Sequence, residues 1–511
     1  MSDTATTVIA LLDEGAPDAT ALSTPAGIPL TYAALRALAA QTLAALNAQG
    51  VGRNDRVAIV LDNGPEMATA FVCIASGATA APLNPAYRAE EFEFYLSDLN
   101  ARILVVERDK SSPAVDVARK LGVPVVRLAA MPDKGAGSFT LQFPERPALP
   151  KPQMTGPAGP DDIALVLHTS GTTSRPKIVP LSQRNVCASA RHIRQTLALT
   201  AKDRGLGIMP LFHIHGLIAG TLAPLSAGGE VCCTTGFNAL RFFSWMAEVR
   251  PTWYTAVPTM HQTILSRAGK NSDVIKANPL RFIRSSSSSL APQIITELEA
   301  VFGAPVIESY GMTEAAHQMA SNPLPPGERK PGTVGIAAGP EVGVIDSQGN
   351  LLPRGATGEI AIRGPNVMSG YENNPKANGE AFVNGWFRTG DQGVMDAEGY
   401  VTITGRLKEI INRGGEKISP REVDEVLMDH PAVQQCVTFA LPHDKLGEDV
   451  AAAVVLREGA QVSEKDLREF AAKRLADFKV PRKILILPEI PKGATGKTQR
   501  IGLAQKLGLT Q

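Results

Sequence analysis

Helical and strand-like patterns alternate through the first part of the chain. Residues 30–50 carry apolar side chains at helical spacing and end at Gly50, a common type of helix stop. The apolar run RVAIVL at 56–61 predicts a short buried strand that ends before Asn63 and Gly64. After it we expect, in order, a helix from Pro65, a strand at 79–82, a helix from Ala89 and a strand at 102–107. This alternation predicts a mostly parallel sheet with helices on both faces.

The pattern changes in the later parts of the chain. The Pro-rich stretch 143–160 predicts an exposed connection between two subdomains. Residues 342–364 and 386–406 contain short strand-like runs separated by turn residues, which is typical of β-hairpins. Beyond them we expect a separate α+β domain of about 100 residues, with helices near 420–429 and 463–474 and a strand at 451–456.

Composition and charge exclude several classes of protein. Apolar residues make up 44% of the 511 residues, which is enough for a large core and too many for a disordered chain. The 51 basic and 50 acidic residues leave a formal charge of +1, so the charge balance does not favour nucleic-acid binding. Five scattered cysteines without a C-x-x-C pair favour a reducing compartment over a disulfide framework or a structural zinc site.

Two long stretches, 67–87 and 205–229, carry no charge and are long enough to cross a membrane. Glycines and prolines interrupt both, so we expect buried loops and strands of a soluble protein without membrane contact. The N-terminus lacks the basic start of a signal peptide, and the final residues KLGLTQ are not a peroxisomal address. The expected location is therefore the cytoplasm.

The segment HTSGTTSRPKIVPLS at 168–182 is the strongest single chemical signal. It follows the strand-like run IALVL and gathers small hydroxyl residues and a glycine ahead of Lys177. Hydroxyl and backbone N–H donors on such a turn can converge on phosphate oxygens, while the lysine adds positive charge. A P-loop ending is missing here, and Gly496-Lys497-Thr498 lacks the glycine that a P-loop needs five residues earlier. We therefore predict a phosphate-binding loop of another kind.

Five motifs follow one another in order: TSGTTSRPK, ESYGMTEA (308–315), WFRTGD (386–391), TGRLKEIINRGGEKISP (404–420) and PKGATGKTQR (491–500). Together they resemble the adenylate-forming superfamily of acyl-CoA synthetases, luciferases and peptide-synthetase adenylation domains. The resemblance implies an α/β fold with a large N-terminal domain of mixed α/β subdomains plus a β-hairpin-rich subdomain, and a small mobile α+β C-terminal domain. The implied limits are 1–404, a hinge at 405–408, and 409–511.

The resemblance also implies a two-step reaction that uses ATP, Mg²⁺ and coenzyme A. A carboxylate attacks the α-phosphate of ATP to give an acyl-adenylate and pyrophosphate, and a thiol then displaces AMP. Both reactants of the first step are anions, so charge neutralisation and positioning dominate catalysis. The expected partners are a small carboxylic acid, ATP and CoA, with no obligatory protein partner.

The same resemblance assigns nucleotide-binding roles along the motifs. Tyr310 is expected to pack on adenine, Thr313 to touch the α-phosphate, and Glu314 to bind Mg²⁺. Asp391 is expected to accept hydrogen bonds from both ribose hydroxyls, with Arg406 near the ribose and phosphate. The full set of expected ATP and AMP contacts is Thr169, Ser170, Gly171, Thr172, Thr173, Lys177, Glu308, Tyr310, Gly311, Thr313, Asp391 and Arg406.

Parts of the C-terminal segment receive roles in the same way. Lys497 is expected to be the catalytic lysine, with its ammonium between the attacking carboxylate and the α-phosphate. Gly414, Gly415 and Lys417 are expected to contact CoA, and the two glycines leave room for its pantetheine arm. Lys408 stands at the pivot about which the small domain is expected to rotate between the two half-reactions.

Two departures from the family pattern and three alternatives stand beside this prediction. Ser174 and Ile178 stand where glycine is common in relatives, so phosphate-loop roles belong to the segment rather than to single atoms. A peptide-synthetase adenylation domain is less favoured, since no carrier-like domain follows Lys497. A luciferase stays open, although nothing in the chain favours oxygen chemistry. A non-catalytic nucleotide-binding regulator is disfavoured because the glutamate, aspartate and lysine of the motifs are all present.

The acyl pocket, placed by the same motifs, has a polar lining that includes His215, Ser287, Ser288, Ser289 and His317. Buried donors without acceptors penalise plain alkyl acids, whereas a second carboxylate would satisfy them. The segments HIHGL, RSSSSSLAP and MTEAAHQMASNPLPP also resemble the oxalate–CoA ligase branch of the superfamily. We therefore expect a very short dicarboxylic acid, oxalate first and malonate second. A medium-chain fatty or aryl acid is the alternative.

Overall fold

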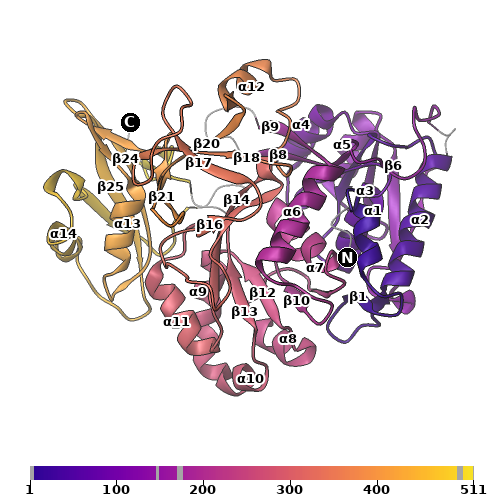
Figure 1. Ribbon diagram of the computed structural model, residues 1–511, viewed down its shortest axis with the longest axis horizontal. Helices are drawn as coiled ribbons and strands as arrows, with labels where there is room; N and C mark the ends of the chain where they lie inside the picture. Colours follow the sequence, from indigo (N-terminus) through magenta and orange to yellow (C-terminus); the bar gives the residue numbers. More distant parts are fainter. Residues whose placement is uncertain (1–4, 146–148, 170–175, 492–498, 510–511) are drawn as a thin grey trace.

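The computed structural model describes residues 5–145, 149–169, 176–491 and 499–509. This part of the chain forms four β-sheets with helices packed around them. In Figure 1 the colours run from the indigo N-terminal part, through the magenta and orange centre, to the yellow C-terminal part at the opposite end. The predicted α/β class is confirmed.

The first sheet confirms the predicted parallel arrangement near the N-terminus. Its seven strands lie in the order β7 (Phe139–Gln142), β6 (Val125–Ala130), β5 (Ile103–Glu107), β3 (Arg56–Val60), β4 (Thr79–Pro82), β8 (Ile163–Thr169) and β9 (Lys177–Ser182). The five inner strands pair in parallel, and the two edge strands are antiparallel to their neighbours.

Helices cover both faces of this sheet because its strands are apolar on both sides. The covering helices are α2 (Tyr32–Ala48), α3 (Pro65–Ala75), α4 (Ala89–Leu99) and α5 (Pro113–Lys120). Val57 and Ile59 of β3 belong to the core that includes α2 and α3, whereas Ala58 and Val60 belong to the core of α4 and α5. Successive residues of a strand point to opposite faces, so one short strand contributes to two cores.

The second sheet carries several of the predicted site residues, including Glu308, Tyr310 and His317. Its nine strands lie in the order β16 (Ile336–Ala337), β15 (His317–Ser321), β14 (Val306–Met312), β13 (Phe282–Ser285), β12 (Trp253–Ala256), β10 (Arg204–Gly207), β11 (Glu230–Cys233), β1 (Thr20–Ser23) and β2 (Leu30–Thr31). Strands β13 and β14 are parallel neighbours, and β14 pairs antiparallel with β15. The parallel pairing of β1 with β11 places Leu22 opposite Val231, a contact that no local pattern predicts.

The two uncharged stretches are buried, but the expectation that they form loops and strands is wrong in part. The first includes α3, which the helical pattern from Pro65 did predict. The second includes an eight-residue π-helix, η3 (His215–Leu222), which was not predicted. Gly216 lies inside η3. A Cβ at this position would lie 2.2 Å from Pro210 O, so this close approach of the backbone requires glycine. Within the described ranges, no helix is both long and apolar enough to cross a bilayer.

The predicted hairpins form the third sheet. Its strands are β17 (Glu341–Ile345), β18 (Thr357–Arg363), β20 (Trp386–Met395), β19 (Phe382–Val383) and β21 (Val401–Arg406). All of their pairings are antiparallel, and the pairing of β20 with β21 sets Asp391 opposite Arg406.

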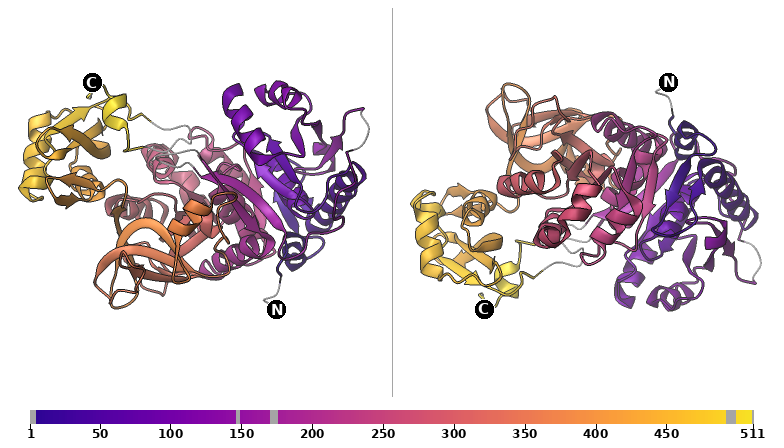
Figure 2. Two further views of the ribbon diagram at one scale, coloured as in Figure 1. Left: turned by 90° about the horizontal axis from the view of Figure 1, so that it is seen from above. Right: turned by 90° about the horizontal axis from the view of Figure 1, so that it is seen from below.

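The C-terminal segment has its own sheet, and Figure 2 shows it as a separate body at one end of the molecule. The sheet consists of β23 (Glu416–Ile418), β22 (Ile411–Arg413), β25 (Gly447–Leu456), β24 (Val433–His443) and β26 (Lys483–Ile486). The two predicted helices are present as α13 (Pro420–Met428) and α14 (Glu464–Ala472). Helix α13 begins at Pro420 because the Ser419 side chain accepts a hydrogen bond from Glu422 N and proline suits the first helical position.

Contacts between the C-terminal body and the rest of the chain include those of α13 and of the residue after it. Arg421 Nη1 donates to Ile403 O at 2.6 Å, and Gln293 Nε2 donates to Asp429 Oδ1 at 2.8 Å. Residues 405–408, the expected hinge, lie at the end of β21 between the third and the C-terminal sheets. The domain limits 1–404 and 409–511 stay predictions.

Candidate active site

The predicted phosphate loop connects two paired strands. Strands β8 and β9 are antiparallel, and Thr169 lies opposite Lys177 where the loop leaves and rejoins the sheet. Both side chains are half-buried. The predicted contacts Ser170, Gly171, Thr172 and Thr173 lie outside the described residues.

Tyr371, which the sequence patterns did not single out, joins Lys177 to Glu314. The Tyr371 hydroxyl donates a hydrogen bond to Glu314 Oε1 at 2.8 Å, and Lys177 Nζ lies 4.2 Å from the centre of the Tyr371 ring. Glu314 is buried, and this burial raises the pKa of its carboxyl, against the opposing effects of the Tyr371 hydrogen bond and the Lys177 charge. The Tyr371 side chain therefore contacts the Glu314 carboxyl through its hydroxyl and the Lys177 ammonium through its ring.

A single buried carboxylate fits Mg²⁺ when the ion arrives with a nucleotide. Within the described ranges, no group of three or more His, Cys, Asp or Glu side chains could hold a metal ion. Mg²⁺ commonly binds one or two carboxylates and completes its shell with phosphate oxygens and water. Glu314 supplies one such carboxylate beside Lys177, so the residues present fit a magnesium ion that is shared with ATP phosphates.

The turn between β14 and β15 brings Glu314 close to His317. It consists of a 3₁₀ turn at Thr313–Ala315, followed by Ala316 and His317 with φ of 46° and 103°. Positive φ is unfavourable for residues with a Cβ, so the surrounding structure must impose it, which is common at functional sites. A Cβ at Gly311 would lie 1.9 Å from His317 O, so this tight turn also requires glycine.

Tyr310, Asp391 and Arg406 form one hydrogen-bonded group. The Tyr310 hydroxyl donates to Asp391 Oδ2, and Arg406 Nε donates to Asp391 Oδ1 at 3.1 Å. Burial and the Asp391 charge raise the pKa of the Tyr310 hydroxyl well above its ordinary value. These donors engage both carboxylate oxygens of Asp391. A ribose that binds Asp391 through two hydroxyls must therefore displace one of these donors or share a carboxylate oxygen with it.

Glu308 lies where β14 meets the C-terminal helix α13. Its Oε2 accepts a hydrogen bond from Gly332 N at 3.3 Å. Burial raises the pKa of Glu308 to about 8, and of the nearby charges Arg421 lowers it and Glu425 raises it. In this conformation the carboxyl faces charged residues of α13, and its predicted contact with ATP stays a prediction.

The predicted acid-binding histidines meet in a buried polar group. The rings of His215 and His317 stack with centroids 4.8 Å apart, and His215 Nδ1 lies 2.9 Å from Ser287 Oγ. Both imidazoles are at most 2% exposed. The structure therefore brings His215, His317 and Ser287 together, whereas Ser288 and Ser289 are exposed.

Arg284 completes this group, and the sequence analysis missed it. Its Nη1 lies 3.1 Å from His317 Nε2 and 3.3 Å from both His215 Nε2 and Thr255 Oγ1. Its Nη2 lies 3.4 Å from Gln318 Oε1, whereas Nε has no hydrogen-bond partner. The one available signal was its position between the apolar pair Phe282-Ile283 and the serine run that starts at Ser285. We call Arg284, His215, His317, Thr255 and Ser287 the polar cluster.

Among the described residues, no carboxylate neutralises the charge of Arg284. The side chain is fully buried, burial alone lowers its pKa to about 9, and no acidic side chain in the described ranges forms an ion pair with it. Buried charges are normally paired, because a desolvated charge without a counter-charge is costly. The polar cluster can therefore bind a small anion through charge-assisted hydrogen bonds.

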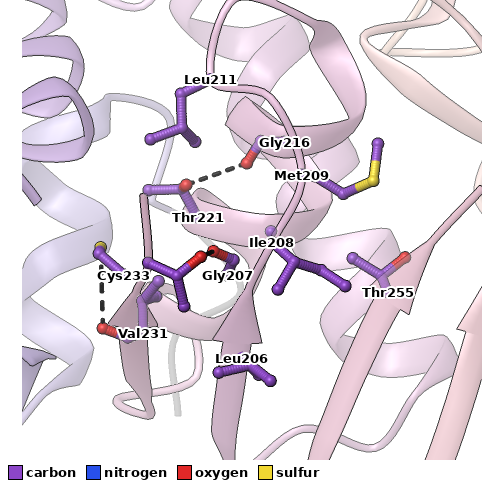
Figure 3. Close-up of a pocket in the computed structure, with 12 residues that line it drawn as sticks. Leu206, Gly207, Ile208, Met209, Leu211, Gly216, Thr221, Val231, Cys233 and Thr255 are labelled. Carbon is purple, nitrogen blue, oxygen red and sulfur yellow. Dashed lines mark hydrogen bonds between the residues drawn. The ribbon is translucent and has the colours of Figure 1, made fainter. Parts of the chain in front are cut away.

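A largely apolar cavity adjoins the polar cluster at Thr255 (Figure 3). It lies among the ends of β10, β11 and β12 and the turns of η3. The Thr221 hydroxyl is turned back within η3, where it donates to Gly216 O at 2.9 Å. The apolar side chains that line the cavity include Leu206, Ile208, Met209, Leu211 and Val231.

The predicted CoA contacts form a tight turn between β22 and β23. Gly414 and Gly415 have φ of 59° and 103°, and two consecutive positive values favour glycine in a two-residue hairpin loop. Lys417 on β23 and Lys408 in the turn after β21 are both exposed. Lys497 lies outside the described residues, and the roles of all these residues stay predictions.

Two family models match most of the chain. A model described as AMP-binding enzyme matches residues 12–372, and one described as AMP-binding enzyme C-terminal domain matches residues 422–497. The chain belongs to the AMP-binding enzyme family. The predicted membership of the adenylate-forming superfamily is thereby confirmed.

Relatives of this AMP-binding enzyme include two oxalate–CoA ligases. One from Arabidopsis thaliana is 45% identical over 509 residues, which are 99% of this chain and 98% of that protein. One from Saccharomyces cerevisiae is 43% identical and covers 89% of this chain and 87% of that protein. The ATP-bound structure of MatB from Rhodopseudomonas palustris superposes with a TM-score of 0.87 at 30% identity, covering 98% of this chain and 99% of the other. These relatives place the chain among the AMP-forming acid–CoA ligases.

Proposed function

We propose that this AMP-binding enzyme is an ATP-dependent oxalate–CoA ligase, with malonate as the second-best acid. In the first step an oxalate oxygen attacks the α-phosphorus of ATP, and the bond to pyrophosphate breaks. In the second step the CoA thiolate attacks the acyl carbonyl carbon, and the bond to AMP breaks. The products are oxalyl-CoA, AMP and pyrophosphate.

The observation that carries the proposal is the unpaired charge of Arg284 beside two stacked imidazoles. The distal carboxylate of oxalate would pair with the guanidinium and accept hydrogen bonds from His317 and from a serine hydroxyl, most directly that of Ser287. A fatty or aryl acid would leave Arg284 buried without a counter-charge, and sites built for a polar group reject analogues that lack it by large factors. The names of the two relatives above agree with this choice.

The position of the cluster also favours a very short acid. His317 follows Glu314 by only three residues, and the tight turn between them keeps the polar cluster close to the proposed metal ligand. The reacting carboxylate must reach the α-phosphate while the distal one reaches Arg284. A two-carbon diacid suits this short span, and malonate adds one methylene.

The proposed roles of the nucleotide-site residues follow from their charges. Lys177 would hold the β- and γ-phosphates, Thr313 the α-phosphate, and Asp391 the ribose hydroxyls. Lys497 would stabilise charge that develops between the carboxylate and the α-phosphate, an effect on the scale of about 3–4 kcal/mol for one well-placed group. Mg²⁺ bound to Glu314 and the phosphates would supply further positive charge.

A CoA ligase for a medium-chain fatty or aryl acid is the second candidate. The apolar lining beside Thr255, which includes Leu206, Ile208 and Leu211, is the observation that favours it (Figure 3). In this conformation the cavity has room for little more than one water molecule, so it would have to widen to take a hydrocarbon tail. Such an acid would lie beside the polar cluster without forming an ion pair between its tail and Arg284.

The test is a comparison of kcat/KM for oxalate, malonate, acetate, octanoate and a coumarate, measured by ATP–pyrophosphate exchange and by thioester formation. We expect oxalate to be the best substrate. Arg284→Met should lower kcat/KM for oxalate by about 1,000-fold or more. Because this change replaces a lone buried charge with an apolar side chain of similar size, the variant should be at least as stable as the parent.

Two further variants sharpen the comparison. His317→Ala should also depress oxalate turnover. Arg281→Met is the matched control, because Arg281 lies three residues away, is paired with Asp203 at 2.9 Å and does not touch the polar cluster, so oxalate turnover should persist. The proposal fails if octanoate or coumarate is preferred to oxalate, or if both cluster variants turn over oxalate normally.

A further inference from the structure

The segment that carries Tyr371 is tied to the backbone on both sides of the proposed metal–phosphate site. At one end Met368 N donates to Glu314 O at 2.8 Å, within the turn between β14 and β15. At the other end Glu372 N donates to Ile178 O at 3.2 Å, next to Lys177 on β9. The segment therefore spans from the proposed metal ligand to the proposed phosphate-binding lysine.

Tyr371 itself is held firmly between these two ends. Its side chain is only 7% exposed. Its backbone is fixed by Asn378, whose side chain accepts from Tyr371 N at 2.7 Å and donates to Tyr371 O at 2.8 Å. From this fixed position the hydroxyl donates to Glu314 Oε1 at 2.8 Å and the ring faces Lys177 Nζ at 4.2 Å.

These two contacts have different effects on the groups that they hold. A donor to one carboxylate oxygen stops the carboxylate from rotating, and residues that orient a metal ligand in this way strengthen metal binding. The face of an aromatic ring attracts an ammonium group and so fixes the end of a flexible lysine chain. One tyrosine thus restrains both charged groups that would meet the metal-bound phosphates.

We propose that Tyr371 is a positioning residue for the metal–phosphate end of ATP. Its hydroxyl orients Glu314 toward Mg²⁺, and its ring holds the Lys177 ammonium toward the phosphates. The inference rests on the proposed function only in requiring that the chain bind ATP with a divalent cation, and it does not depend on the acid that is used.

The chain contains a matched control for this arrangement. Lys330 Nζ lies 4.3 Å from the centre of the Tyr400 ring, and the Tyr400 hydroxyl donates to Glu328 O at 2.7 Å. Tyr400 is 8% exposed, almost the same as Tyr371. Lys330 pairs with Asp396 at 2.7 Å, away from Glu314, so Tyr400→Phe removes an equivalent hydroxyl without touching the proposed site.

The experiment measures cation binding directly on the full-length protein. Mn²⁺ is titrated by electron paramagnetic resonance with saturating α,β-methylene-ATP, an analogue that cannot transfer its adenylyl group, and without acid or CoA. Tyr371→Phe keeps the ring and removes the hydroxyl, so the Mn²⁺ concentration for half-saturation should rise by about 10–100-fold. Tyr400→Phe should leave it unchanged. Tyr371→Leu should in addition weaken binding of the metal-free analogue, because Lys177 loses its ring.

Normal Mn²⁺ binding by folded Tyr371→Phe would overturn the inference, and so would equal losses in Tyr371→Phe and Tyr400→Phe. Should Tyr371→Phe fail to fold, Asn378→Ala loosens the backbone of Tyr371 and keeps its side chain. A rise in the half-saturating Mn²⁺ concentration then supports the role, and no change overturns it. If oxalate proves to be a poor substrate while these effects persist, the proposed substrate is wrong and the role of Tyr371 stands.

Discussion

Arg284 and Glu308 are buried ionisable residues, and burial shifts the pKa of each in the direction that favours its uncharged form. Burial disfavours the charged form of each, lowering the pKa of Arg284 to about 9 and raising that of Glu308 to about 8. Their surroundings differ. Arg284 lies among histidine, hydroxyl and amide side chains, with no acidic partner among the described residues, whereas Glu308 lies near Arg421 and Glu425 of α13.

Glu308→Gln should change how stability depends on pH. The folded pKa of about 8 lies above the ordinary value of 4.5, so the folded state binds the proton more tightly than the unfolded state. The contribution of Glu308 to stability is therefore present at low pH and is lost as the pH rises through about 8. The variant should melt above the parent at pH 8.5, and this gap should shrink at pH 5.

Melting curves at several pH values check this expectation. Glu416→Gln is the control, since Glu416 is exposed and should show the same small difference at every pH. A gap for Glu308→Gln that is constant between pH 5 and pH 8.5 would show that its carboxyl does not titrate as described.

At the scale of elements, the turn between β14 and β15 contains several of the proposed site residues. It carries Thr313, Glu314 and His317, and its shape depends on the antiparallel pairing that sets Gly311 opposite Gln318. A small shift of this turn would move the proposed metal ligand and the polar cluster together.

Gly311→Ala tests how strictly this turn is specified. The added Cβ would lie 1.9 Å from a backbone oxygen, so the two strands must separate. We expect adenylation to fall by about 100-fold, the scale of a misplacement near 1 Å in an active site. Gly379→Ala, in α12 (Pro375–Ala381), has no atom within 4 Å of the new Cβ and should preserve activity. Pyrophosphate exchange and melting temperature measure both variants, and normal exchange by Gly311→Ala would contradict the tight-turn account.

At the scale of the whole molecule, a half-buried group of ion pairs connects the region after the expected hinge with the C-terminal part of the chain. Arg500 Nη2 lies 2.7 Å from Asp424 Oδ2 on α13, and its Nε lies 3.3 Å from Glu409 Oε2. Glu409 directly follows residues 405–408. These pairs join Glu409 to Arg500 and Arg500 to α13, so we expect a rotation between half-reactions to occur within the residues that precede Glu409.

Lys408→Pro and Lys497→Ala should therefore affect opposite half-reactions. Proline fixes φ, so Lys408→Pro should depress thioester formation from supplied acyl-AMP more than it depresses acyl-AMP formation. Lys497→Ala should do the reverse, because it removes charge needed only for adenylation. Measuring the two half-reactions separately tests both roles. Unchanged turnover by Lys408→Pro argues against a pivot there, and equal losses in both steps for Lys497→Ala argue against its proposed role.

The sequence by itself determined the local elements and the family. The helix α3 and the strand β4 begin where predicted, because apolar spacing, prolines and capping residues act over a few positions. The five ordered motifs were sufficient for the superfamily. The structure places His215 and His317 together with Ser287, and their role in binding the acid stays a prediction. These signals are local, or they are read from residue identity at known motif positions.

Only the tertiary structure decided which residues complete the candidate site. Arg284, on β13, is ordinary in sequence and becomes informative only when its burial and the absence of an acidic partner among the described residues are known. Tyr371 gains its proposed role from Glu314 and Lys177, which lie 57 and 194 positions earlier in the chain. The pairing of β1 with β11 is of the same kind. Local patterns cannot determine such features, because the cost of burying a charge and the geometry of a hydrogen bond depend on groups that folding brings together from distant parts of the chain.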